Sequence, residues 1–596
     1  MLKIYKASAG SGKTFQLVVE YLKLILKNPL NYRHILAVTF TNKATAEMKT
    51  RILEQLNMLA SGHESNYISI LEKETKFDET QIRSRAKQVL KNILHDYNRF
   101  SVSTIDTFTQ RVIKAFNREM GISPDYQLEL DNEVLLAEAT DRLLANIGND
   151  KNLLAWLQDF SREKIEDNQS QRIEENIKKL GHELFKEKFQ VFFPTENNSV
   201  YSRENLDEFI KELNSKKTVI ENTLKKLGGK AVALMAEYGF ATEDFSYSTT
   251  GIAGYLTAIS NGVFKEPGKR VLDAETEPEK WYQKKHPQAA KIHRLVEDQL
   301  QPVLIEALEY YRKNEKSYFT TLAVLKQIRM LGILTDLKEQ VSELLHEKGV
   351  LQISDSNLLL SKIIGQSDSP FIYEKTGSNF SHFMLDEFQD TSGLQWNNFR
   401  PLLANSLSEG NENLIVGDVK QSVYRWRNSN WKILAEQVYS DFNAEQIDEN
   451  ILEKNWRSDL NILTFNNQFF SELQNTFGEQ QFRQFADEKE EIVARFRRIY
   501  DSLEQKPGQE NPVPTGLVDI RFLPEENFTE VSAEFLVKQV KKLQDNGIKA
   551  AEIAILIRKN KEGVPIIQRF MESAKLPENS KYNLSVLSTE PLFLYS

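Results

Sequence analysis

The sequence contains no cysteine, and this absence excludes several kinds of chemistry. A chain without thiols forms no disulfide bond, holds no metal through thiolate ligands and uses no cysteine nucleophile. It also has no run of about 18 consecutive apolar residues, the length that a membrane-spanning helix needs. With 40% hydrophobic and 27% charged residues, its composition is typical of a globular protein. We therefore expect a cytoplasmic protein without membrane contact, built of about four domains or subdomains.

The chain lacks an excess of positive charge as well. Its formal net charge of −9 argues against a protein that coats nucleic acid by bulk charge. A local basic groove is still compatible with this charge, because fields act over roughly 8–10 Å in physiological salt. The first 60 residues differ from the whole, since nine Lys and Arg residues face three Glu residues there, a balance of +6.

Short apolar segments near both ends of the chain alternate with helix-periodic segments, a rhythm typical of a parallel sheet covered by helices. The middle, from about residue 125 to 350, is charged and helix-periodic, with a turn-rich break at Lys265–Lys280. Because strand-like segments resume only after it, we interpret it as a helical insertion; an independent helical domain is the alternative. The expected strands of the surrounding sheet are Leu2–Lys6, Ile35–Phe40, Phe100–Ile105, His382–Leu385 and Leu414–Val416.

This pattern predicts three domains. We expect residues 1–124 and 351–440 to form the first α/β domain and residues 125–350 to form a helical accessory domain. We expect residues 441–596 to form a second α/β domain, with strands at Val518–Phe522 and Ile553–Ile557. These two strands follow a Pro/Gly-rich surface connection at Glu504–Gly516.

A glycine-containing loop follows the first expected strand. Ala7–Thr14 reads ASAGSGKT and matches the phosphate-binding pattern G-x4-G-K-[ST] except for Ala7. A helix beginning near Lys13 would also direct its positive end at the phosphates. We expect Lys13 to reach the β- and γ-phosphates and the Thr14 hydroxyl to bind Mg²⁺; a glycine-rich turn without ligand is the alternative. The expected nucleotide-binding residues of this loop are Ala9, Gly10, Ser11, Gly12, Lys13 and Thr14.

Two adjacent carboxylates end another expected strand, in Phe383–Thr391 (FMLDEFQDT). Ligands of parallel sheets bind at the carboxyl ends of the strands. Adjacent carboxylates suit a division of labour, in which Asp386 holds the Mg²⁺ shell and Glu387 orients and deprotonates an attacking water. A solvated acidic turn is the alternative, which the phosphate-binding loop disfavours.

Taken together, these motifs and several others along the chain resemble those of a known family, the superfamily 1 DNA helicases of the UvrD/RecB type. The resemblance implies an α/β fold with a P-loop (RecA-like) motor domain, a large helical insertion and a partial second RecA-like domain. It also implies an ATP-dependent helicase that moves 3′ to 5′ in recombination and repair and is associated with the bacterial nucleoid. The residues of its motifs resemble most the RecB/AddA helicase–nuclease branch. The motifs that carry it are Ala7–Thr14, Ile35–Ile52, Ser103–Phe108, Leu385–Thr391, Val416–Arg427 and Leu452–Ser458.

The resemblance implies further roles at the nucleotide. Gln421 would sense the γ-phosphate, and Arg457 would be an arginine finger from the second motor domain. Trp456 stands where the family places an aromatic ring against adenine, and its π-face suits stacking. The implied cofactors are ATP and Mg²⁺.

A DNA path is implied beside this site, because aromatic rings stack on successive bases and hydroxyls or amides hold phosphates without reading sequence. For Phe40, packing in the core is an equal alternative. For Trp426, between two arginines, surface stacking is favoured. The implied DNA-binding residues are Phe40, Thr41, Asn42, Thr104, Phe108, Tyr424 and Trp426.

Two later motifs of the family are not found, and Leu587–Ser596 resembles the point where relatives leave the second motor domain. We therefore expect a part of a longer protein whose second motor domain is incomplete. Its expected partners are single-stranded DNA or DNA ends and a second helicase–nuclease subunit. Two alternatives remain: binding of ATP and DNA without significant turnover, and a P-loop kinase or other transferase.

Overall fold

The computed structural model describes residues 1–118, 127–129, 132–166, 172–192, 201–366, 379–476, 494, 497–500 and 503–588. These residues belong to two compact units. The first comprises Met1–Trp456 and Gln480–Gln505, and the second comprises Arg457–Glu479 and Lys506–Ser596. The motif-like end at Leu587–Ser596 lies almost entirely outside the described residues. Within the described part of the chain, no helix is both long and apolar enough to cross a membrane.

The first unit is built on a six-stranded sheet in the order β3-β2-β6-β7-β1-β8, and the neighbouring strands run parallel. The five strands expected for this sheet are confirmed, with ends shifted by two residues or fewer. This fold confirms the predicted α/β class with a parallel-strand sheet. The strands are β1 (Leu2–Ala7), β2 (Ile35–Thr39), β3 (Val102–Thr104), β6 (His382–Leu385), β7 (Asn413–Gly417) and β8 (Ile447–Leu452).

Strand β8 corrects the expected domain boundary. The sequence pattern places the end of the first α/β domain at residue 440, but β8 pairs in parallel with β1, from Leu2 opposite Ile447 to Ala7 opposite Leu452. Its side chains alternate between half-buried and exposed, as suits an edge strand, and they lack the continuous apolar run that marks a central strand. The first sheet therefore includes residues that the pattern assigns to the second domain.

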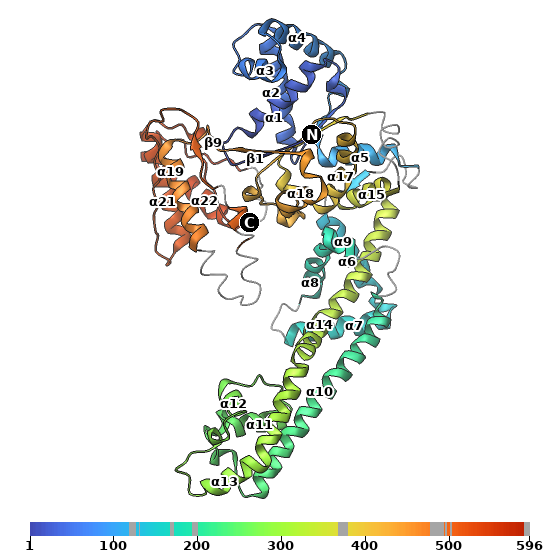
Figure 1. The fold of residues 1–596 in the computed structure, drawn as a ribbon, viewed down its shortest axis with the longest axis vertical. Coiled ribbons are helices and arrows are strands. Elements are labelled where there is room, and N and C mark those ends of the chain that lie inside the picture. Colours follow the sequence, from blue (N-terminus) through green and yellow to red (C-terminus); the bar gives the residue numbers. More distant parts are fainter. Residues whose placement is uncertain are drawn as a thin grey trace. The chain divides into compact units, whose positions relative to one another are not determined.

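Helices cover both faces of this sheet (Figure 1). Successive strand residues point to opposite faces, so Tyr5 and Met384 pack under one helical layer while Ile4 and Leu385 pack under the other. The first layer consists of α1 (Lys13–Lys27), α2 (Asn42–Ala60), α3 (Ile68–Thr75) and α4 (Glu79–His95). The second consists of α5 (Ile105–Ala115), α15 (Ile353–Gln366), α17 (Gly393–Ser408) and α18 (Val438–Asp441).

The helical segment leaves the sheet after α5 and returns before α15. The short strands β4 (Gln127–Glu129) and β5 (Val350–Gln352) pair in parallel, so the two ends of the segment lie together. Two long helices, α10 (Arg203–Glu237) and α14 (Gln301–Lys348), run side by side through it (Figure 1). The shorter helices α6 (Asn132–Ala145), α7 (Lys151–Glu166), α8 (Ile173–Gly181), α9 (Glu187–Phe192), α11 (Ile252–Ser260), α12 (Lys269–Asp273) and α13 (Ala289–Leu295) pack around this pair.

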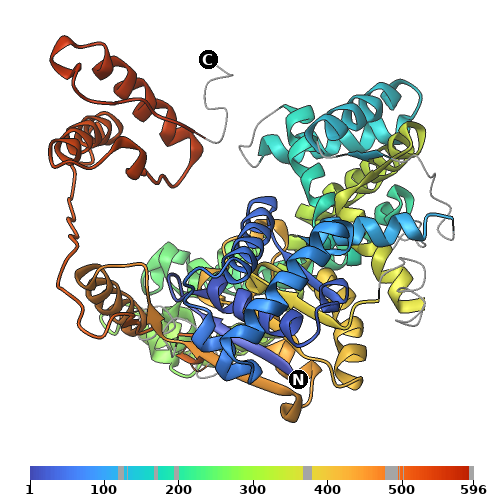
Figure 2. The same ribbon diagram turned by 90° about the horizontal axis from the view of Figure 1, so that it is seen from above.

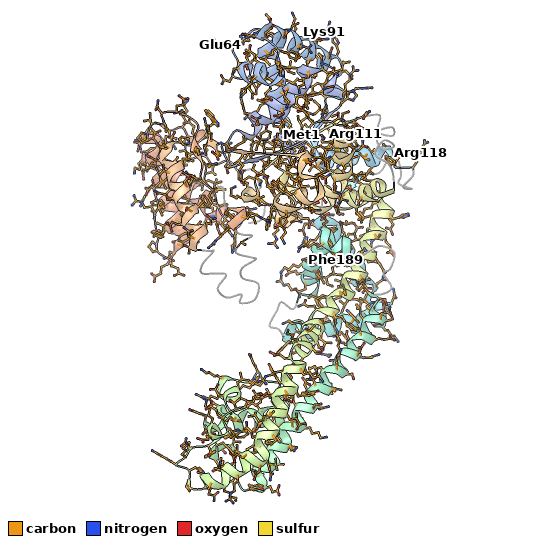
Figure 3. The ribbon with its side chains drawn as sticks, viewed as in Figure 1. Met1, Glu64, Lys91, Arg111, Arg118 and Phe189 are labelled. Atoms are coloured by element: carbon orange, nitrogen blue, oxygen red, sulfur yellow. The ribbon has the colours of Figure 1, made fainter. Side chains whose placement is uncertain are left out.

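Two separate apolar clusters stabilise the helical segment. One gathers α6, α7 and α8 around the C-terminal part of α14, and Phe189 of α9, labelled in Figure 3, packs at its edge. The other gathers α11, α12 and α13 around the C-terminal part of α10 and the N-terminal part of α14, with Trp281 fully buried. Gly332 lets α14 approach Trp156, because a Cβ there would stand 2.7 Å from the indole ring.

The second unit contains α19 (Leu460–Thr476), α21 (Phe528–Asp545) and α22 (Gly563–Ala574), and the last two pack against each other (Figure 2). The expected strands at Val518–Phe522 and Ile553–Ile557 are wrong. A strand must pair its backbone N–H and C=O groups with a neighbour, and in the described residues of this unit neither segment has one. Phe522 and Leu556 are accordingly 98% and 95% exposed.

Candidate nucleotide site and aromatic surface

The loop after β1 has the backbone geometry of a phosphate cradle. Gly10 and Gly12 have φ angles of 79° and 87°, which residues with a side chain rarely adopt. Both the N–H and the hydroxyl of Ser11 donate to the carbonyl of Ser8, at 3.2 and 2.7 Å. Gly12 is the N-cap of α1, so the positive end of the helix lies at the end of the loop.

Lys13 joins the loop to two other motifs. Its Nζ lies 3.1 Å from both carboxylate oxygens of Glu387 and donates to Oε1 of Gln421 at 3.2 Å. These partners are 374 and 408 residues away in the sequence. They meet because β1, β6 and β7 are neighbours in the sheet and present their carboxyl ends at one edge. The three residues predicted to be catalytic in this unit therefore share one place.

The two carboxylates after β6 differ in environment. The Asp386 N–H donates to the carbonyl of Val38, and its Oδ1 accepts from the N–H of Glu387, both at 2.9 Å. Burial, and next the charge of Glu387, raises the pKa of Asp386 to about 6. Glu387 has a left-handed backbone with φ 49°, and its side chain, 34% exposed, forms an ion pair with Lys13. Burial and the Glu387 charge also raise the pKa of Asp390, three residues after Glu387, to about 6.

The donor chemistry at this edge fits Mg²⁺ held together with a nucleotide. In the described part of the chain, no three His, Cys, Asp or Glu side chains cluster into a metal cage. Mg²⁺ is commonly held by one or two carboxylates, waters and substrate phosphates, without a cage made wholly of protein ligands. Asp386, with the Thr14 hydroxyl predicted beside it, matches that description.

Trp456 borders a cavity of about 840 Å³ next to the loop. The backbone N–H of Trp456 donates to the carbonyl of Gly10 at 2.9 Å, and the indole ring lies 3.8 Å from the point where a Cβ on Gly12 would stand. The size is within the range of roughly 300–1,000 Å³ that is usual for ligand pockets. The cavity is lined by Ser11, Gly12, Phe15, Gln16, Asn66, Ile70, Ile451, Leu452, Glu453, Lys454 and Trp456.

Two residues that the sequence analysis missed hold the loop beside this cavity. The side-chain amides of Asn455 and Gln505 both donate to the carbonyl of Ala9, at 3.2 and 3.0 Å, and Asn455 also donates to Gln505. Asn455 stands next to Trp456 within the motif Leu452–Ser458, so its position was a usable signal. Gln505 belongs to no motif, and only the folded chain brings it to the loop.

An aromatic surface lies beside the nucleotide site. Phe40 follows β2 and stacks on Tyr424, with ring centroids 4.9 Å apart, and Tyr424 lies 6.0 Å from Trp426. The guanidinium of Arg427 lies over Trp426 at 4.5 Å from the ring centre. Trp426 is 68% exposed, whereas Phe40 and Tyr424 are half-buried. This surface suits stacking on bases next to a cation for their phosphates.

Two of the residues predicted to contact DNA, Thr104 and Phe108, are buried, which argues against direct stacking on bases. Phe108 is a core residue, 5% exposed, and its ring lies 5.3 Å from that of Phe399. Its position on α5 turns the side chain under the sheet, because apolar α5 residues cover that face. Thr104 is 8% exposed and caps α5, with its hydroxyl accepting from the Thr107 N–H at 3.2 Å. The neighbouring Arg111 of α5, labelled in Figure 3, lies over the Phe380 ring at 5.9 Å.

The remaining predicted site residues stay predictions. The hydroxyl of Thr41 caps α2 by accepting from the Ala44 N–H at 3.1 Å, and Asn42 is exposed at the start of that helix. Arg457 is the first residue of the second unit, so its role as an arginine finger is not tested by the contacts within the first unit.

A parallel sheet with a glycine loop, a lysine and an acidic strand end at one edge defines a P-loop nucleotide-binding domain. Comparison with known proteins makes this specific. The family model of the UvrD/REP helicase N-terminal domain matches residues 3–443. This chain therefore belongs to the UvrD/REP helicase family.

Several bacterial relatives are similar over most of this chain. An ATP-dependent helicase/nuclease subunit of Staphylococcus carnosus is 24% identical over 91% of this chain and 43% of its own length. The protein of the same name from Clostridium novyi is 23% identical over 96% of this chain and 48% of its own. The exonuclease/helicase subunit RexA of Streptococcus pneumoniae is 24% identical, covering 93% and 44%. The chain thus spans less than half the length of these relatives.

Proposed function

We propose that this chain is the ATP-binding part of a motor that moves 3′ to 5′ along single-stranded DNA and separates strands during recombination and repair. The observation that carries this proposal is the meeting of Lys13, Glu387 and Gln421 at one sheet edge. Motors of this kind need a phosphate-binding lysine, a residue that activates water and a sensor of the γ-phosphate gathered at one site.

Each residue then has a distinct task when ATP is bound. Lys13 leaves Glu387 and neutralises the β- and γ-phosphates, and Glu387 accepts the proton of the attacking water. Gln421 positions that water with its amide, and Arg457 is the proposed arginine finger, which would stabilise charge on the phosphates. Thr14 and Asp386 would hold Mg²⁺, which when bound would supply further neutralisation of phosphate charge.

DNA binding is assigned to the aromatic surface of Phe40, Tyr424 and Trp426, with Thr41 and Asn42 as phosphate contacts. Stacking is worth roughly 1–3 kcal/mol per base and tolerates any sequence, since every base has a π-face. A motor that moves along DNA needs this tolerance. The adjacent Arg427 adds a phosphate contact that strengthens at low salt.

The relatives' names point to a partner. Each is named as one subunit of a helicase/nuclease, and we propose that this chain also works beside a partner subunit, in an assembly with a nuclease function. Residues 1–124, together with the chain from residue 351 to the end of β8, serve as the first motor domain. Residues 125–350 serve as an accessory domain. The expected location in the bacterial cytoplasm, at the nucleoid, stays a prediction.

Steady-state ATP hydrolysis by the 596-residue chain, with and without single-stranded DNA, tests this proposal. We expect DNA to stimulate turnover, and Lys13→Ala to abolish it by removing the phosphate contact. Turnover that depends on a small phosphate acceptor and ignores DNA would instead establish a kinase or other transferase.

A second candidate is binding of ATP and DNA without significant turnover. It is favoured by one observation: the described residues of the second unit, which would carry the arginine finger, form no parallel sheet. Tight binding of both ligands with no detectable hydrolysis would establish it.

A further inference from the structure

Gln389 is a buried amide between the nucleotide site and the segment that carries the aromatic surface. It lies in the turn Phe388–Asp390 and is 1% exposed. Its Nε2 donates to Oε2 of Glu387 at 2.6 Å, and its Oε1 accepts from the backbone N–H of Asp418 at 2.9 Å. A side-chain amide offers a donor and an acceptor at these two positions without a charge.

These contacts close a ring of hydrogen bonds. Lys13 donates to Glu387 and to Gln421, Gln421 donates to Oδ2 of Asp418 at 2.8 Å, and Asp418 donates to Gln389, which donates back to Glu387. Every member of the ring thus depends on two others. Hydrogen bonds linked in this way in a buried site polarise one another, so changing one partner affects the rest.

The turn after Glu387 holds the segment 418–430 at two further points. The Ser422 hydroxyl donates to the carbonyl of Gln389 at 3.2 Å, and the Asn430 N–H donates to the carbonyl of Thr391 at 3.0 Å. Between these anchors lie Tyr424 and Trp426. Gly417 allows the approach of Gln389, because a Cβ there would stand 2.8 Å from Oε1 of Gln389.

We propose that Gln389 is a positioning residue that aligns Glu387 and transmits the occupation of the γ-phosphate site to the aromatic surface. A phosphate that takes Lys13 removes the donor that Glu387 and Gln421 share. Glu387 then keeps Gln389 as its neutral donor, and Gln421 reorients against Asp418. Because Asp418 and Ser422 are both bonded to Gln389, the change reaches Tyr424 two residues further on.

The inference rests on the proposed function, and two variants of Gln389 test it. Gln389→Met keeps the length of the side chain but removes both hydrogen bonds. Gln389→Glu keeps the acceptor for the Asp418 N–H but loses the donor to Glu387. Gln395→Met is the matched control, because Gln395 is also buried in this region but, among the described residues, its side chain bonds only to Ser392.

The first measurement is amide hydrogen exchange of residues 418–427 without ligands. In Gln389→Met we expect exchange about 2- to 10-fold faster, because the Asp418 N–H loses its hydrogen bond to the side chain of residue 389. In Gln389→Glu and Gln395→Met we expect exchange at Asp418 as in the wild type. The second is the ratio of single-stranded DNA affinities with a non-hydrolysable ATP analogue and with ADP. Allosteric coupling is typically about 5- to 150-fold, and we expect both Gln389 variants to bring this ratio to within about twofold of 1.

Each outcome has one meaning. Wild-type exchange in Gln389→Met, or a wild-type affinity ratio in either Gln389 variant, would overturn the inference. The same loss in Gln395→Met would overturn it too, because the effect would then reflect general loosening. If the wild-type chain bound neither nucleotide nor DNA, the proposed function would fail, while the exchange measurement would still decide whether Gln389 holds the segment.

Discussion

Replacing Trp456 with alanine should weaken nucleotide binding without weakening the fold. The indole ring borders the cavity beside the phosphate loop and is 65% exposed, so the folded chain loses little buried contact with it. Its backbone N–H bond to Gly10 survives the substitution, so the loop keeps this anchor. An exposed substitution of this kind usually changes stability by less than about 0.5 kcal/mol.

The expected magnitude follows from the stacking of two aromatic rings. Such a pair is worth about 0.5–1.5 kcal/mol beyond the area it buries, which corresponds to roughly 2- to 13-fold in the dissociation constant. Equilibrium titration with a fluorescent ATP analogue measures this constant directly. Trp456→Phe should recover most of the loss, because the smaller ring still stacks.

Trp426→Ala provides a reciprocal control, since Trp426 is 68% exposed and lies on the aromatic surface. Without DNA present, Trp426→Ala should leave the nucleotide dissociation constant unchanged. Our reasoning is refuted if Trp456→Ala binds the nucleotide as tightly as the wild type, or if both tryptophan variants weaken nucleotide binding equally.

Three further predictions concern other parts of the first unit. Trp426→Ala should weaken single-stranded DNA binding by about 5- to 150-fold, the loss of one stacked base, and lower DNA-stimulated ATP turnover; unchanged stimulation would contradict this. Phe108→Ala should cost about 3–5 kcal/mol of unfolding free energy in a denaturant titration because the ring is buried, and little loss would place the ring outside the core. The third prediction concerns Glu412. Burial by itself raises the pKa of this carboxyl, but the ion pairs with Lys23 and Lys27 outweigh burial and lower the pKa from 4.5 to about 2. This stabilisation is present above about pH 4.5 and is lost as the pH falls toward 2. Glu412→Gln should therefore cost about 1–2 kcal/mol at pH 7 after allowance for solvent screening, and the difference from the wild type should shrink between pH 5 and 2.

The local chemistry of the nucleotide site could be predicted because short motifs encode it. The loop needs glycines where the backbone takes positive φ, and Lys13 follows at the start of a helix. Asp386 and Glu387 end an apolar segment, and the strands around them are short runs of buried residues. Each of these signals lies within about ten residues, the distance over which sequence pattern reports backbone geometry.

The errors fall where pattern gives no information about neighbours. Phe108 and Trp426 are both aromatic residues in family motifs, yet only the first turns under the sheet. Ile553–Ile557 has the composition of a strand but lacks a paired neighbour in the described residues, and Ile553 and Ile555 pack against α21 and α22 instead. Strand β8 was missed because an edge strand has alternating half-buried and exposed residues and no continuous apolar run.

The sequence by itself determined which groups we predict at the phosphate: the glycine loop, Lys13, Asp386, Glu387 and Gln421. The tertiary structure decided which of them touch. The order β6-β7-β1 places Glu387 and Gln421, which are 374 and 408 residues from Lys13 in the sequence, within hydrogen-bond distance of it. It also inserts Gln389 between the acidic strand end and the aromatic surface. The physical reason is that residue type fixes what a group can donate or accept, whereas long-range packing fixes where its partner stands.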